Sequence, residues 1–401
     1  MGVLVEQTRS LFTGALRSIT PGSWGAGDRE LTRLLFGDRP TAAGVPVTEQ
    51  AVLGIPAVRG CLDIQTGGVR MCPLILYREL PDGSRERATD YHLYPVLHDA
   101  PNDEQDAAEF WSLVAESVIL HGNALAEKML DGAGRVRALI FIRWDRVAVG
   151  RDSTGRLIYR VSNFAGHPDV TLVADEVLHV RGGFSVNGGF TGQGVLQTSR
   201  DLFANALAMQ QYAATFFGQG ATMGGVISHP GQMTDTARES FRAYLARQHA
   251  GVDRAHRLLL LEEKMTYTPI TATPEAAQLV EAQQALAEQC CRALNVPAHL
   301  LGVSRTGLTY TSTEHEAAAW VKTSLGPLLL RISGAVNRAL IPRLERGRFH
   351  AEFLTEGLLR ASTLERYQAY RVGLGDQPFL DVEWVRRRES LPPMPSNGGA
   401  A

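Results

Sequence analysis

The chain lacks the cysteine pattern of a disulfide or zinc framework. Its 401 residues hold four cysteines, all in apolar segments and none in a Cys-x-x-Cys spacing: Cys61, Cys72, Cys290 and Cys291. The adjacent pair, Cys290 and Cys291, points to different faces of a helix, which argues against a shared disulfide or metal. We therefore expect four reduced thiols and a protein made in a reducing compartment.

Long apolar runs and an excess of one charge are also missing. No apolar run reaches the roughly 18 residues that a membrane span needs, and the first residues lack the apolar core and cleavage site of a secretory signal. The formal net charge is −2, whereas proteins that hold nucleic acid by counterion release are usually clearly basic. We expect neither a membrane partner nor tight binding of nucleic acid.

Catalytic motifs are incomplete wherever they begin. His315-Glu316 resembles half of the His-Glu-x-x-His zinc motif, but the second histidine would fall at position 319, where Ala319 stands. The same stretch forms a capping box, in which Thr313 accepts from a first-turn N–H and Glu316 reaches back to the Thr313 N–H. We interpret it as the start of a helix.

The glycine-rich segment RGGFSVNGGFTGQG, residues 181–194, lacks the Gly-Lys-Ser/Thr ending of a phosphate-binding loop. We interpret it as a flexible connector. His179 alternates with apolar residues on a predicted strand and is expected to be a half-buried structural histidine. No nucleophile elbow or paired carboxylates stand out, so we predict no enzyme, no metal and no cofactor; a hydrolase that uses the glycine-rich loop or the His-Glu pair stays as the less favoured alternative.

The pattern of elements predicts an α+β fold. In the first half, a helix over 101–123 precedes short β-rich runs between 124 and 180 with turn signals between them. We expect Asn102 or Asp103 to cap that helix and Gly122-Asn123 to end it.

The second half is dominated by long helices. One starts near residue 195, and another covers 274–296 with Leu279, Ala282, Leu286, Cys290 and Leu294 on its apolar face. Between them, the pattern predicts a small strand–helix–strand insertion. A further helix is expected over 313–341. Gly326-Pro327 interrupts it, because proline removes a backbone N–H and crowds the carbonyl four residues earlier, so a kink is expected there.

Several stretches in this order resemble the portal proteins of tailed bacteriophages, in the Hong Kong 97-type branch that includes gene transfer agent portals. The resemblance covers about residues 50 to 393. It is carried by HDAPN, LHGNALAEK, DEVLHVRG, FFGQGATMGGVI, TATPEAAQLVEAQQALAEQCCRALNVPAHLLG and TSLGPLLLRISGAVNRALIP.

The resemblance implies a division of the chain into named parts. These are an N-terminal arm (1–45), a wing (46–196, rejoined by 313–362), two stem helices (197–220 and 274–296), a clip (221–273), a tunnel loop (297–312) and a crown with the C-terminal tail (363–401).

The resemblance also implies a function. Such subunits form a ring, typically of twelve, at one capsid vertex, through which double-stranded DNA is packaged and later ejected without sequence preference. The implied partners are the terminase large subunit, the head–tail connector and the major capsid protein, in a virion assembled in the cytoplasm of a bacterial host. A capsid or connector protein without a channel is the other alternative. Within the tunnel loop, weak contacts with the DNA backbone are expected from Arg305, Thr306, Thr309 and Tyr310.

Overall fold

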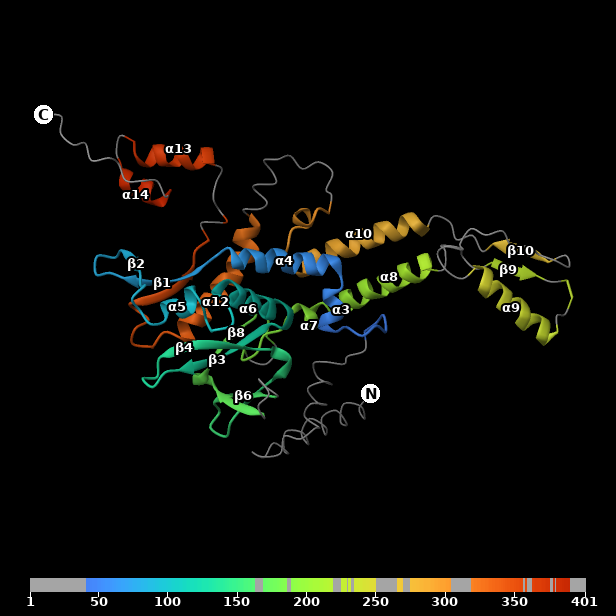
Figure 1. Cartoon of the computed structure of the whole chain (residues 1–401), viewed down its shortest axis with the longest axis horizontal. Coiled ribbons are helices and arrows are strands. Elements are labelled where there is room, and N and C mark those ends of the chain that lie inside the picture. The colour runs from blue at the N-terminus through green and yellow to red at the C-terminus, as the bar shows by residue number, and fades with distance from the viewer. Residues whose placement is uncertain are drawn as a thin grey trace, which may run out of the picture.

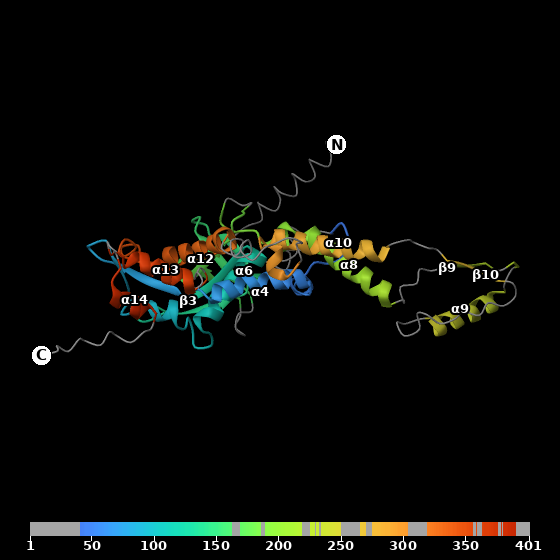
Figure 2. The ribbon, with the colours of Figure 1, turned by 90° about the horizontal axis from the view of Figure 1, so that it is seen from above.

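The protein has an elongated shape, with a wide body at one end and a helical hairpin that projects from it (Figures 1 and 2). A computed structural model of the chain describes residues 41–162, 169–185, 189–218, 225–228, 230–231, 234–249, 265–269, 275–303, 319–355, 358, 363–375, 378 and 380–389. The expected mixture of helices and antiparallel sheets is confirmed.

The body contains three small antiparallel sheets, ordered β11-β1-β2, β4-β3-β8 and β5-β6-β7. Strand β11 comes from far along the chain, and its Phe353 lies opposite Leu74 of β1. The strands are β1 (Leu74–Glu79), β2 (Arg85–Arg87), β3 (Asn123–Leu130), β4 (Val136–Ile142), β5 (Val147–Arg151), β6 (Leu157–Val161), β7 (Val170–Val173), β8 (Val177–Arg181) and β11 (Phe349–Phe353).

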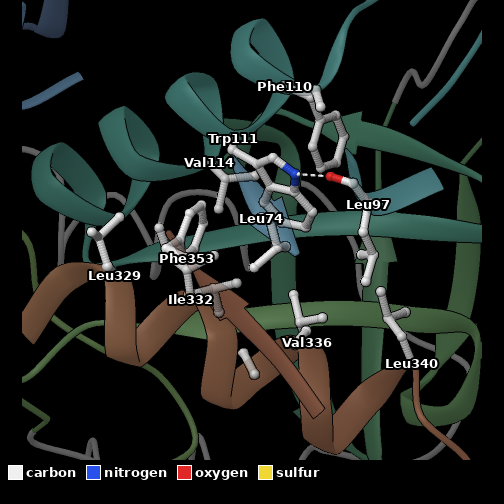
Figure 3. Close-up of a cluster of buried hydrophobic side chains, with 14 of the residues drawn as sticks. Leu74, Leu97, Phe110, Trp111, Val114, Leu329, Ile332, Val336, Leu340 and Phe353 are labelled. Atoms are coloured by element: carbon white, nitrogen blue, oxygen red, sulfur yellow. Dashed lines mark hydrogen bonds between the residues drawn. The ribbon is translucent and has the colours of Figure 1, made fainter. Parts of the chain in front are cut away.

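Helices cover these sheets on more than one side. In the close-up of the main core, α6 and α12 lie on opposite sides of the buried cluster (Figure 3). The helices of the body are α3 (Glu49–Leu53), α4 (Pro56–Arg70), α5 (Tyr94–His98), α6 (Ala107–His121), α7 (Val195–Thr198) and α12 (Gly326–Ala339). Two further helices, α13 (Thr363–Gly373) and α14 (Val382–Arg388), follow the last strand.

The main core is built around Trp111 of α6. This side chain is 2% exposed, and its indole Nε1 donates to the Leu97 carbonyl at 2.9 Å, so its single polar group is satisfied inside an apolar cluster (Figure 3). Phe353 of β11 and Ile332 of α12 belong to the same cluster. The body therefore requires segments far apart in the sequence, because residues 319–353 complete a core that the first half of the chain begins.

The start of α6 differs from the prediction. Asp106 is the N-cap, and its side chain accepts from the Glu109 backbone N–H at 2.7 Å. Asn102 instead accepts from the Glu104 N–H, while its Nδ2 donates to the Leu139 carbonyl of β4. The prediction of Asn102 or Asp103 as the cap was wrong. Several neighbouring side chains are able to accept a hydrogen bond from the backbone N–H groups at this helix start, and only tertiary contact decides which of them does so. The predicted end at Gly122 is confirmed, with φ of 75°.

Four glycines bring separate backbone segments into direct contact where α6 turns into β3. A Cβ on Gly194 would lie 2.1 Å from the Leu120 carbonyl oxygen, and one on Gly192 would lie 2.2 Å from the Gly122 carbonyl oxygen. The Gly182 N–H also donates to the Gly122 carbonyl at 2.6 Å. Both described ends of the 181–194 segment are therefore packed against the body, and the expectation of a flexible connector is wrong for them.

Asn123 fastens the same junction with its side chain. Its Oδ1 accepts from the Gly192 N–H at 2.8 Å and lies 3.1 Å from His179 Nε2, and its Nδ2 donates to the Gly192 carbonyl at 2.8 Å. The Ser117 hydroxyl donates to the Asn123 carbonyl at 2.6 Å. Since α7 and the long helix α8 (Arg200–Gly218) follow within a few residues, this network sets the place at which the hairpin leaves the body.

His179 is a buried structural histidine, as expected, although it is more deeply buried than a half-exposed strand position. It is 5% exposed, lies 3.0 Å from the Tyr159 hydroxyl through Nδ1, and stacks on Trp144. Burial lowers the pKa of His179 to about 3, and the charges of Arg181 and Arg338 act in the same direction. The ring is therefore neutral at neutral pH.

Replacing Gly194 with alanine tests the glycine contacts. The added Cβ would meet backbone atoms that cannot move independently, so we expect a loss of about 3 kcal/mol in the free energy of unfolding. Gly67→Ala is the matched control, because a Cβ added to this helical glycine would have no atom within 4 Å and alanine should stabilise the helix by up to about 1 kcal/mol. Urea denaturation measures both, and equal stabilities of the two variants would contradict the contact.

The pKa of His179 predicts a dependence of stability on pH. Between pH 6.5 and about 3, the unfolded chain binds a proton at this position and the folded chain does not, so stability falls as the pH falls, by at most about 1.4 kcal/mol per pH unit. His179→Gln removes the titrating group. We expect this variant to lose less stability than the wild type between pH 7 and pH 5 in urea denaturation; equal losses would contradict the assignment.

Candidate functional site at the helical hairpin and its junction

The hairpin consists of α8 and α10 (Glu275–Ala293), which run side by side away from the body (Figures 1 and 2). At its far end lie an antiparallel strand pair and one helix, namely β9 (Gly225–Ser228), α9 (Asp235–His249) and β10 (Thr266–Pro269). The predicted strand–helix–strand order between the two long helices is thus observed in the described residues.

The base of the hairpin is buried in a second core, formed with α3 and α4. Phe203 of α8 and Cys290 of α10 are both fully buried in it. The Gln65 amide of α4 donates to the Leu294 carbonyl just after α10. All four cysteines are buried and reduced, and burial raises the pKa of Cys72 and of Cys290 to about 11, so these thiols are protonated and unreactive.

Beyond the base, the two helices leave an open apolar groove of about 730 Å³ between them. Tyr212 on α8 is 52% exposed there, and Val280 on α10 is 62% exposed nearby. Leu279, Ala282 and Leu286, the outer half of the predicted apolar face of α10, line the groove together with Asn205, Ala208, Met209, Tyr212, Ala285 and Gln289. An apolar groove of this kind, exposed on a projecting element, is typical of a surface that another protein segment covers.

A second, more polar cavity of about 390 Å³ lies where the hairpin meets the long helix of the body. Its walls come from the end of α10, from the short 3-10 helix η4 (Ala298–Leu301) and from the residues before α12, which include Trp320 and Thr323. Residues 304–318 connect these walls along the chain. The cavity is therefore bounded by the end of α10, by the first residues of the expected tunnel loop (297–299) and by the helix that follows that loop.

Gly326 and Pro327 occupy the first positions of α12, directly after a π-helical turn at Val321–Leu325. Within this turn, the Gly326 N–H donates to the Val321 carbonyl five residues earlier. Pro327 has no N–H for the Thr323 carbonyl, and the Asn295 side chain approaches that oxygen at 3.5 Å. Extra turns of this type often accompany kinks, and the kink expected at Gly326-Pro327 stays a prediction.

Asn295 adopts a left-handed conformation with φ of 54°, which stops α10. Asparagine tolerates this region better than most residues. The Asn295 side chain extends from the end of α10 toward the Thr323 carbonyl, just before α12. One residue therefore both ends a helix of the hairpin and contacts the long helix that Pro327 interrupts.

The remaining sequence-predicted site residues lie outside the described part of the chain. These are the four candidates for DNA contact, Arg305, Thr306, Thr309 and Tyr310, and the two capping residues, Thr313 and Glu316. The groove between α8 and α10 and the contact between Asn295 and Thr323 were not predicted as sites. The apolar face of α10 was the available signal for the groove; nothing in the sequence indicated the contact.

Within the described residues, no group of three or more His, Cys, Asp or Glu side chains could hold a metal ion. Over the same residues, none of the helices is both long enough and apolar enough to cross a membrane.

The fold defines a class of protein, an elongated α+β subunit with a projecting hairpin, and solved structures of this class are known. A Hong Kong 97 family phage portal protein from Corynebacterium diphtheriae superposes with a TM-score of 0.58 at 19% identity, over 78% of this chain and 97% of that one. A chain from the neck of a native gene transfer agent particle, computed with C12 symmetry, superposes with a TM-score of 0.55 at 21% identity, over 95% and 99% of the two chains.

Sequence comparison leads to the family. The probable portal protein of Streptomyces phage phiC31 is 27% identical over 375 residues, or 89% of this chain and 79% of its own length. The portal protein of Enterobacteria phage HK97 is 24% identical, with 87% and 81% coverage. The family model described as phage portal protein matches residues 56–389. The chain belongs to the phage portal protein family, as the motifs predicted.

Asn295 provides a test of the junction. Asn295→Ala should lower the free energy of unfolding by roughly 1–2 kcal/mol, because alanine tolerates the left-handed conformation poorly and cannot donate to the Thr323 carbonyl. Asn295→Gly also loses the side chain but accepts the conformation, so its loss should be clearly smaller. Equal losses for the two variants in urea denaturation would show that backbone conformation is not what this position provides.

Proposed function

We propose that the chain is the subunit of a portal ring at one vertex of a virion capsid, through which double-stranded DNA is packaged and ejected. Family membership over residues 56–389 is the observation that carries this proposal. The open groove on the hairpin supports it, because an isolated chain leaves apolar surface exposed that a neighbouring copy in a ring would cover. Twelve copies agree with the C12 symmetry used for the similar gene transfer agent neck.

The parts of the ring subunit follow the elements. We assign residues 46–196 and 313–362 to the wing, because β11 pairs with β1 and α12 completes the main core. The hairpin helices, 197–220 and 274–296, form the stem, and the far unit, 221–273, forms the clip. Residues 297–312 form the tunnel loop, 363–401 the crown and tail, and 1–45 an arm.

A DNA conduit has particular physical requirements. Strong contacts between cationic side chains and phosphates would hold the duplex in place, and contacts with base edges would favour particular sequences; either would impede a passing genome. A chain of formal net charge −2 suits this role. Within the tunnel loop, Arg305 offers one transient phosphate contact, and the hydroxyl groups of Thr306, Thr309 and Tyr310 offer short-lived hydrogen bonds.

The ring works as a structural platform and not as an enzyme. The energy for packaging comes from a separate motor, so we propose the terminase large subunit as a transient partner. The head–tail connector is expected to dock on the clip, and the major capsid protein is expected around the wing. Assembly takes place in the cytoplasm of the bacterial host.

A capsid or connector protein without a channel is the alternative from a related class. The groove on the hairpin would serve subunit contact in that case too, so the shape of the assembly decides. A ring with a central hole seen along its axis supports a portal.

The experiment is negative-stain electron microscopy and mass photometry of the purified chain. A dodecamer of 43.7 kDa subunits has a mass of about 520 kDa, and we expect rings with a central channel. Ala208→Glu places a carboxylate in the groove and should reduce the ring fraction at least tenfold, because burial of an unpaired charge is unfavourable by several kcal/mol.

Gln211→Glu is the matched control, since it adds the same charge to α8 outside the residues that line the groove, and it should form rings as the wild type does. A wild type that remains monomeric in all conditions would contradict the proposed function. Normal rings from a folded Ala208→Glu variant would contradict the role of the groove alone.

A further inference from the structure

Four arginines, Arg181, Arg331, Arg338 and Arg346, lie on one side of the body, and no acid among the described residues forms an ion pair with them. Arg331 and Arg338 lie seven residues apart on α12, and therefore on nearly the same face of that helix. Arg331 reaches Gly183, just after β8, where its Nη2 would lie 2.8 Å from an added Cβ. Arg338 Nη2 donates to the His179 carbonyl of β8 at 3.4 Å, and Arg346 Nη2 donates to the Arg338 carbonyl at 2.6 Å.

The charges of these arginines are not compensated by the described residues. The ion pairs in the described part of the chain use other arginines. Burial lowers the pKa of Arg338, and the like charges of Arg181 and Arg346 lower it further. Backbone carbonyls accept hydrogen bonds from the guanidinium groups of Arg181, Arg338 and Arg346, but they leave the positive charges of these arginines uncompensated. Such an arrangement is unfavourable in an isolated chain and favourable against an acidic surface.

An exposed aromatic side chain accompanies these arginines. Phe184 follows Gly183, which Arg331 reaches, and is 73% exposed. We call Arg181, Phe184, Arg331, Arg338 and Arg346 the arginine face. Arginine and aromatic side chains together are typical of the centres of protein–protein interfaces. A phosphate backbone would pair with the cations and leave the Phe184 ring exposed, so the combination of arginines with an exposed aromatic side chain favours a protein partner over nucleic acid.

The chain carries a surface of opposite charge on the other side of the same core. Four exposed acids lie just before or within the first turn of α6: Asp103, Glu104, Asp106 and Glu109. No described lysine or arginine forms an ion pair with them. We call these residues the acidic face. Met71, which is 61% exposed, follows Arg70, whose Nε donates to Ser112 of α6. Figure 3 shows α6 and α12 on opposite sides of the core cluster.

Opposite faces of a subunit meet in a ring. A head-to-tail contact joins one surface of a copy to a different surface of the next, and the repeated contact closes into a ring. Two faces of opposite charge on either side of one rigid core have the placement that such a contact needs. A contact related by a twofold axis would instead bring the arginine face against itself, with like charges opposed.

We propose that the arginine face docks on the acidic face of a second copy of this chain. This inference rests on the proposed ring and identifies which surfaces of the body join its subunits. The charges orient neighbouring bodies, while Phe184 supplies apolar area that becomes buried in the contact.

The test uses charge reversal on the full chain, with mass photometry and negative-stain microscopy as readouts. Arg331→Glu/Arg338→Glu reverses one face, and Asp103→Lys/Glu104→Lys reverses the other. Each should lower the ring fraction roughly tenfold at equal protein concentration, because like charges then oppose each other. The quadruple variant, with both faces reversed, should restore rings to within about threefold of the wild type. Arg242→Glu on the far unit is the control and should form normal rings.

Circular dichroism verifies that each variant is folded. If Arg331→Glu/Arg338→Glu is unfolded, Arg331→Glu alone decides, because it leaves the contact between Arg338 and His179 intact. Normal rings from either folded single-face variant would overturn the inference while the proposed function stands. A quadruple variant that stays monomeric would overturn the pairing of these two faces. Intact rings with weakened DNA binding would assign the arginine face to nucleic acid and would also overturn it. A wild type without rings would overturn the proposed function itself.

Discussion

The contact of backbone against backbone at the turn from α6 to β3 is the constraint on which the rest of the structure depends. Gly122 and Gly194 approach so closely that a single added carbon on either one would lie within 2.5 Å of a main-chain atom of the facing segment. The Asn123 side chain then fastens the loop by hydrogen bonds to both the N–H and the carbonyl of Gly192. Because α7 and α8 start directly after this loop, the path of the whole hairpin follows from a place where no side chain fits.

The apolar side chains of the molecule form two kinds of surface, one buried within the chain and one exposed. The part that holds one chain together is closed: the core around Trp111 joins the first half of the body to α12 and β11, and the second core closes the base of the hairpin. The part on the outer hairpin is open, in the groove beside Tyr212. A subunit that is stable as a folded chain and incomplete in its surfaces has the physical character of a component of an assembly.

The charge distribution has the same character. Although the net charge is only −2, the charged side chains are unevenly distributed. Arginines lie on one side of the main core and acids on the other, and neither group forms ion pairs with other described residues. The net charge is a sum over all such patches. It therefore indicates how strongly the whole chain attracts DNA at long range, but it does not indicate which surfaces of neighbouring subunits are in contact.

Much of the fold was predictable from local patterns. The helix that ends at Gly122, the alternating strands between residues 124 and 180, and the strand–helix–strand insertion follow from periodicity, glycine and turn chemistry, and the ordered motifs led to the right family. The cap of α6 was not predictable, because Asn102 and Asp106 are both able to cap and only the contact of Asn102 with the Leu139 carbonyl selects Asp106. The packing of the glycine-rich segment was also missed, since glycine permits both mobility and close approach.

The candidate site divides in the same way. The apolar face of α10 and the proline at position 327 are properties of the sequence, because spacing and the missing N–H require no partner to be recognised. Tertiary structure alone decided that Leu279 and Leu286 face an open groove and not a core, and that Asn295 lies near the carbonyl left by Pro327. It also decided that Arg331 reaches Gly183 and that Arg338 lies near Arg181 of β8. Each of these pairs distant parts of the chain, and a local pattern carries no information about which distant segment will lie beside it.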